Sequence, residues 1–183
     1  RKIGNKYLDK SFSYLISKLS NVLVIEDPLF KHYKRKYIEK NPIISLTYFK
    51  VLSYLKKRKK QKNISILNEN ILFELNDKYE IKLDYKEIIS HFFSMYEIFK
   101  KFLSKKQIKS VYVNCSYSIN SIALIKAAND LNINTFEVQH GLISKAHIGY
   151  NIYKSIDNSF YPNVLLSFGE IEKEIFINNH YYN

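Results

Sequence analysis

Glycine, proline, cysteine and tryptophan are scarce in this chain of 183 residues, which has four Gly, three Pro, one Cys and no Trp. The single cysteine, Cys115, excludes an internal disulfide and fits a reducing compartment. Because no apolar run reaches about 18 residues, we expect no membrane span. No Cys/His group has the spacing of zinc ligands, so we expect no metal site. The chain begins at Arg1 without the apolar core of a signal peptide, which indicates a cytoplasmic protein or a piece of one.

Positive charge is concentrated in one segment of the chain. The formal net charge is +12, and residues 31–62 hold twelve Lys and Arg against one acid, Glu39. Residues 63–183 have a net charge of −1. We expect a basic segment over residues 29–62, whose first part is a long mobile loop. Such a segment suits an anionic membrane surface or another polyanion, although a solvated basic face has the same composition.

Hydrophobic periodicity divides the chain into helices and strands. Apolar residues at three- and four-residue steps predict helices at 7–19, 43–60, 84–104, 120–131 and 170–178. Short apolar runs predict strands at 21–26, 111–114, 135–139 and 163–167. Residues 63–83 fit either two short strands or irregular structure. The strand–helix–strand order from residue 111 predicts a parallel crossover, and the chain as a whole predicts one α/β domain over residues 1–183.

Two of the predicted helices carry more specific expectations. The helix at 43–60 is expected to turn inward Ile44, Leu46, Tyr48, Val51, Leu52 and Leu55. The helix at 84–104 should begin at an Asp84 N-cap, with Glu87 three residues later completing a capping-box-like pair. His91 lies beside its apolar stripe and is expected to be structural.

Gln139 and His140 lie at the carboxyl end of the strand predicted at 135–139, just before Gly141, and this is the edge where α/β proteins bind ligands. A histidine there can take a proton from a hydroxyl near neutral pH. The amide of Gln139 can orient a sugar hydroxyl, since it both donates and accepts. Gly141 and Gly149 are two of only four glycines, so we expect them at positive φ or close to a ligand. A purely structural role for a strand-end histidine stays open as the alternative.

His147 and Tyr150 form a second cluster in the same loop. His147 can bind a phosphate or a sugar, or can serve as the base in place of His140. The alternative is a loop histidine beside a packed Tyr150.

The turn at 114–118 precedes a predicted helix and offers free backbone N–H groups and hydroxyls to an anion. Asn114 and Ser116 are its candidate ligands, and an ordinary helix cap is the alternative. The turn lacks the glycines of a GxGxxG fingerprint, so we expect no dinucleotide site and no bound cofactor.

The order and spacing of these elements resemble bacterial glycosyltransferases of the GT-B type, which build capsule, lipopolysaccharide and related surface glycans. A His-Gly pair that ends a strand is also similar to the capsule Kdo-transferase and teichoic-acid polymerase groups. The resemblance covers about residues 108–172. It rests on the strand at 111–114, the helix at 122–131, the run 134–141 ending in Gln-His-Gly, His147-Ile-Gly-Tyr150, and the run 161–170.

The resemblance implies a Rossmann-like, three-layer domain with a mainly parallel sheet, the acceptor-binding N-terminal half of a GT-B enzyme. His140 would be the base, Gln139 and Gly141 would shape the pocket, and His147 and Tyr150 would line the same cleft. The nucleotide-sugar donor would bind a C-terminal domain that these 183 residues do not include, so we expect no transfer by this chain alone. The expected partners are a glycan or lipid-linked acceptor and the anionic inner face of the cell membrane.

A non-catalytic α/β binding module is the second hypothesis. Its basic segment at 31–62 would bind nucleic acid or anionic surfaces, because Tyr33, Tyr37, Tyr48 and Phe49 are interleaved with cations there. Nucleic acid is the less favoured partner, since the near-neutral half at 63–183 would then have no role.

Overall fold

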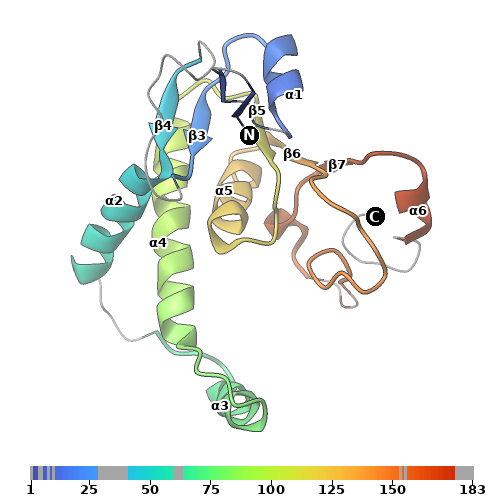
Figure 1. Ribbon diagram of the computed structural model, residues 1–183. Helices are drawn as coiled ribbons and strands as arrows, with labels where there is room; N and C mark the ends of the chain where they lie inside the picture. Colours follow the sequence, from blue (N-terminus) through green and yellow to red (C-terminus); the bar gives the residue numbers. More distant parts are fainter. Residues whose placement is uncertain are drawn as a thin grey trace.

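The computed structural model describes residues 2–3, 6–7, 9, 11–28, 41–59, 64–152, 154 and 156–175. The predicted mobile loop falls largely on residues 29–40, which lie outside the described residues, as do residues 60–63. The elements in chain order (Figure 1) are β1 (Lys2–Ile3), β2 (Lys6–Tyr7), α1 (Ser13–Lys18), β3 (Val24–Glu26), β4 (Ile43–Ser45), α2 (Leu46–Lys59), α3 (Glu69–Lys78), α4 (Tyr85–Ser104), β5 (Ser110–Val113), α5 (Ile119–Asn129), β6 (Asn134–Val138), η2 (Asn158–Phe160), β7 (Val164–Leu166) and α6 (Ile171–Ile175).

Parallel pairing dominates the described strands. β5, β6 and β7 form a parallel sheet in that order, with Val111 opposite Thr135 and Phe136 opposite Val164. β3 and β4 form a second parallel pair, and β1 and β2 a short antiparallel one. The α/β class and the predicted crossover from β5 through α5 to β6 are therefore confirmed. The described strands belong to three small sheets, so the Rossmann-like, three-layer arrangement stays a prediction.

The main core lies where α4 meets α2 and α5. Met95, Phe99 and Leu103 line the buried face of α4 and are almost inaccessible to solvent. Phe49 of α2 packs its ring 5.0 Å from that of Phe99, between ring centroids. The α5 side of the core is made of small side chains, Ala123, Ala127 and Ala128. Small residues let two helices approach closely, so α5 can lie directly against α4 in Figure 1.

The inward face predicted for the helix at 43–60 is partly wrong, although Ile44 and Leu46 do pack against the core. Phe49 and Ser53 are buried against the core, whereas Tyr48, Val51 and Leu55 are exposed. The helix has apolar residues on two sides, and periodicity alone could not decide between them. The aromatic rings of α4 determine which side of α2 is buried, because Phe49 fits between Phe99 and Phe102. The first residues of the predicted helix, Ile43–Ser45, instead form β4 beside β3.

α3 replaces the short strands or irregular structure predicted at 63–83. It lies beyond the N-terminal end of α4 (Figure 1) and has no buried residue. Asn76 holds it there: its Nδ2 donates to the Leu83 carbonyl at 3.0 Å, and its Oδ1 accepts from the Tyr85 hydroxyl at 2.9 Å. The apolar run Ile71-Leu-Phe-Glu-Leu75 therefore belongs to a helix that the core does not cover.

The N-cap of α4 is confirmed, because the Asp84 carboxylate accepts the Glu87 backbone N–H at 2.8 Å. The helix ends at Ser104, as predicted. His91 Nε2 lies 3.2 Å from Asn120 Oδ1 of α5, which fits its predicted structural role. The helix predicted at 7–19 is shorter, since α1 begins at Ser13.

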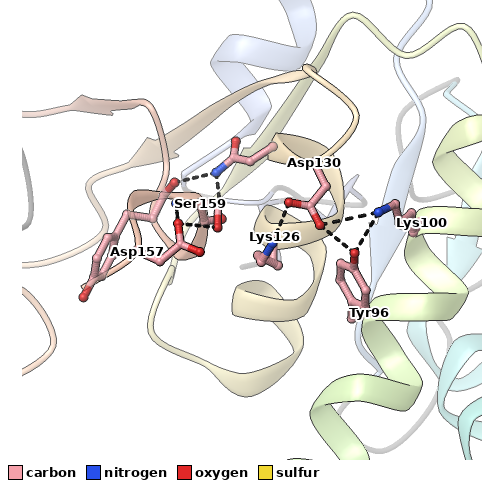
Figure 2. Close-up of polar contacts among 8 residues, drawn as sticks. Tyr96, Lys100, Lys126, Asp130, Asp157 and Ser159 are labelled. Carbon is pink, nitrogen blue, oxygen red and sulfur yellow. Dashed lines mark hydrogen bonds and ion pairs between the residues drawn. The ribbon is translucent and has the colours of Figure 1, made fainter.

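Asp130, the C-cap of α5, joins this helix to α4 (Figure 2). Its Oδ2 accepts the Tyr96 hydroxyl at 2.5 Å, and its Oδ1 accepts Lys126 Nζ at 2.5 Å. Lys100 Nζ donates to the Tyr96 hydroxyl at 2.8 Å and lies 3.5 Å from Asp130 Oδ2. Charged partners around one carboxyl strengthen its hydrogen bonds, so this cluster pins the two helices at the edge of the core.

Acid should weaken the folded state through Asp130. Burial opposes its ionisation, but hydrogen bonds from Lys126 and Tyr96 and the charges of both lysines outweigh burial and lower the pKa of Asp130 below 3.8. A carboxyl with a lowered folded pKa stabilises the protein above its unfolded pKa, and that contribution is lost as pH falls through the folded pKa. We expect the free energy of unfolding in urea to fall below about pH 4, and to fall less steeply in Asp130→Asn. Equal slopes would contradict this assignment.

Candidate functional site

Three loops meet at the carboxyl edge of the parallel sheet. They follow β5, β6 and β7, and because the strands are parallel all three leave the sheet at the same edge. The loop after β6 joins it to β7 and carries the predicted Gln-His-Gly run (Figure 1). The predicted site residues therefore lie at the edge where ligands bind in α/β folds.

One face of β6 is polar and yet buried. Thr135 and Glu137 of β6 alternate with Gln139, which directly follows the strand, and each of the three is at most 1% exposed. Buried polar groups are stable when they are hydrogen-bonded, and all three are. The Thr135 hydroxyl donates to the side-chain oxygens of Asn129 and Asn163, at 2.9 Å each. We call Thr135, Glu137 and Gln139 the polar face of β6.

Gln139 connects the loop after β6 to the loop after β7. Its Nε2 donates to the Gly141 carbonyl at 2.8 Å and to Glu172 Oε1 at 3.0 Å. Its Oε1 accepts the Phe168 backbone N–H at 2.7 Å. The side-chain amide predicted to meet a sugar hydroxyl is thus buried and bonded within the protein. It holds the two loops in place, which agrees with a role in shaping the site rather than with an open contact.

Glu137 makes the equivalent connection to the loop after β5. Its Oε1 accepts the Tyr150 hydroxyl at 2.7 Å and the Ser116 backbone N–H at 3.1 Å. Both partners are buried, so neither Ser116 nor Tyr150 faces solvent as a ligand-contacting residue would. Tyr150 is therefore packed inside the protein, as the alternative interpretation of this loop predicted. Asn114 stays exposed at the end of β5.

Four aromatic rings lie beside the polar face of β6. The Tyr117 ring centroid lies 6.2 Å from His140, 5.5 Å from His147 and 5.6 Å from Tyr150. His147 and Tyr150 are 4.8 Å apart. The Tyr117 hydroxyl lies 3.4 Å from His140 Nε2, at the outer limit of a hydrogen bond, and both side chains are exposed. His140 is therefore accessible, with a phenol beside it.

The second half of this ring cluster is closed. His147 is half-buried, and its Nδ1 has no hydrogen-bond partner among the described residues.

Burial, followed by interactions with Cys115 and Glu137, raises the pKa of the Tyr117 phenol above 10. Tyr117 accordingly stays protonated at neutral pH and can donate a hydrogen bond.

The two loop glycines behave differently. A Cβ at Gly149 would lie 2.6 Å from Cδ1 of the Tyr117 ring, so glycine lets the ring pack against the backbone. A Cβ at Gly141 would meet nothing within 4 Å, and the Gly141 backbone is not in the left-handed region. At Gly149 the close neighbour is a protein side chain and not the expected ligand. Gly141 does not have a positive φ, and its closeness to a ligand stays a prediction.

Sequence reasoning missed Glu137, Tyr117 and Glu172. The alternation of Thr135, Glu137 and Gln139 was the available signal for a polar face, since strand side chains alternate between faces. Nothing in the local sequence links Glu172 to Gln139, which are 33 residues apart. Tyr117 lies in the turn at 114–118, and its contacts with His140, His147 and Gly149 are made only by the tertiary fold.

Neither a metal site nor a membrane-spanning helix is found among the described residues. Comparisons with protein-family models, with curated proteins and with solved structures each give no significant match. The basis for a functional proposal is therefore the geometry at the carboxyl edge of the sheet of β5, β6 and β7.

Proposed function

We propose that this chain is the acceptor-side domain of a glycosyltransferase, which transfers a sugar from a nucleotide-sugar to a surface glycan or lipid-linked acceptor. The observation that carries the proposal is the exposed imidazole of His140, at the carboxyl edge of a parallel sheet, with the Tyr117 hydroxyl 3.4 Å away. The resemblance to GT-B enzymes of the Rossmann-like class supports the same function.

In this proposal His140 is the general base. Its imidazole takes the proton of an acceptor hydroxyl as the oxygen attacks the anomeric carbon of the donor. The bond from that carbon to the nucleotide phosphate breaks, and the nucleotide leaves with the electron pair. A single displacement of this kind inverts the anomeric centre. The Tyr117 hydroxyl keeps the imidazole in place by accepting a hydrogen bond from Nε2–H. In that tautomer Nδ1 is the nitrogen that takes the proton of the acceptor hydroxyl, and the phenol can donate its own hydrogen to the acceptor.

The polar face of β6 gives the base a fixed position. Gln139 precedes His140 directly, and its three hydrogen bonds to Gly141, Phe168 and Glu172 restrict the backbone on both sides of the histidine. A catalytic group is effective when the surrounding residues hold it in the productive geometry. The donor would bind a separate nucleotide-sugar domain, as the resemblance implies.

Substitution of His140 tests this proposal. We expect His140→Ala in the full-length protein to lower the transfer rate by about 10²–10⁴-fold, the usual contribution of a general base. The measurement is nucleotide release from nucleotide-sugars in the presence of bacterial surface oligosaccharides. The matched control is His91→Gln on α4, which should transfer at the wild-type rate. A His140→Ala protein as active as the wild type would remove the assignment of the base.

A further inference from the structure

The outer face of α2 carries apolar side chains that stay exposed to solvent. We define this face by Tyr48, Val51, Tyr54 and Leu55, all of which are more than half exposed. At 3.6 residues per turn these positions fall within about a third of the helix circumference. The opposite face packs Phe49 and Ser53 against the core. A surface helix ordinarily has one apolar stripe facing the core, so the second stripe of α2 indicates a contact outside this domain.

The positive charge near this face favours contact with an anionic surface. Residues 41–62 contain seven Lys and Arg and no Asp or Glu, a formal charge of +7. Lys50 pairs with Asp27 and Lys56 with Glu97. The other five cations fall at positions 57–62, in the last turn of α2 and directly after it in the sequence. An apolar stripe beside a lysine-rich run is the pattern of helices that lie on anionic lipid.

We propose that α2 binds the surface of an anionic lipid bilayer through its outer face. Tyr48, Val51 and Leu55 would enter the boundary between headgroups and acyl chains, and the positive charge that the sequence carries at 57–62 would add attraction to anionic lipid. Each Lys or Arg near such a surface strengthens binding about fivefold. A second copy of this chain fits the face less well, because two segments of +7 would have to approach each other.

α3 provides an internal comparison. It also exposes apolar side chains, among them Ile71 and Phe73, but residues 64–83 hold four acids against two lysines. Anionic lipid should therefore repel α3 and attract α2, although both are apolar. α2 lies on the far side of α4 and α5 from the loop that joins β6 to β7 (Figure 1). Binding through α2 leaves the candidate site open.

Vesicle binding tests this proposal. The purified chain is titrated with vesicles of phosphatidylcholine, and with vesicles that contain about one third phosphatidylglycerol. We expect binding to the anionic vesicles and at least tenfold weaker binding to phosphatidylcholine alone. Val51→Ser combined with Leu55→Ser should weaken binding to anionic vesicles at least tenfold. Replacing Lys57, Arg58 and Lys59 together by Gln should weaken this binding by the same factor. Thermal unfolding curves show whether each variant is folded.

The matched control is Ile71→Ser combined with Phe73→Ser on α3. These side chains are 49% and 56% exposed, against 51% for both Val51 and Leu55, and the control pair should leave vesicle binding unchanged. Equal binding to both vesicle types, or no effect of the α2 pair, would overturn the proposal. So would binding of single-stranded oligothymidine without vesicle binding, or a dimer that the α2 pair dissociates. No sugar donor or acceptor is present, so this proposal and the proposed function can fail separately.

Discussion

Glu137→Ala should lower the free energy of unfolding by about 2–5 kcal/mol. The substitution leaves the Tyr150 hydroxyl and the Ser116 backbone N–H, both hydrogen-bonded to Glu137, without this acceptor inside the protein. A buried donor that loses its acceptor costs about 1–3 kcal/mol, and the missing side chain also leaves a cavity. Urea unfolding followed by circular dichroism measures the loss.

Two further variants separate the hydrogen bonds from the loss of volume. Glu137→Gln keeps the size and a carbonyl acceptor, so it should cost clearly less than Glu137→Ala. Tyr150→Phe removes the hydroxyl that Glu137→Ala strands, so the two substitutions combined should cost less than the sum of their separate effects. Costs that add fully would show that Tyr150 and Glu137 act independently.

Phe99→Ala should destabilise the core by about 3–5 kcal/mol, the usual cost of truncating a buried phenylalanine. The Phe99 ring is 1% exposed and packs against Phe49 of α2. Its removal opens a cavity between α4 and α2. The measurement is the same urea unfolding experiment.

Phe93→Ala is the matched control for this prediction. It is the same substitution on the same helix, but Phe93 is 54% exposed. We expect it to cost less than about 1 kcal/mol, since surface substitutions have small effects. If Phe93→Ala were as costly as Phe99→Ala, the assignment of the buried face of α4 would be wrong.

Local signals were enough to predict the order of elements from Asp84 onward. The Asp84 cap, the long apolar stripe of α4 and the alternation of strand and helix after residue 110 each rest on neighbours in the sequence. The face of α2 and the helical state of α3 could not be predicted in this way. The face of α2 depends on which side chain fits between the rings of α4. The position of α3 depends on the contacts of Asn76 with Leu83 and Tyr85, outside the core.

The candidate site was predicted in outline. The position of His140 at an exposed sheet edge follows from the strand that ends before it. The burial of Gln139 and Tyr150 does not, because their partners Glu172 and Glu137 are assembled by the tertiary fold. Polar side chains in a motif can either meet a ligand or brace the loop that presents one, and the motif does not distinguish these roles.

The polar face of β6 also has a consequence for how this protein can vary. Each of its three side chains has its own hydrogen-bond partners, so a single exchange at one position leaves a donor or acceptor without its partner. In related sequences, residue 135 should therefore change together with residue 163, residue 137 with residue 150, and residue 139 with residue 172. The same pairing resists a shift of the strand by one position, which would bring Phe136 and Val138 against partners that need hydrogen bonds.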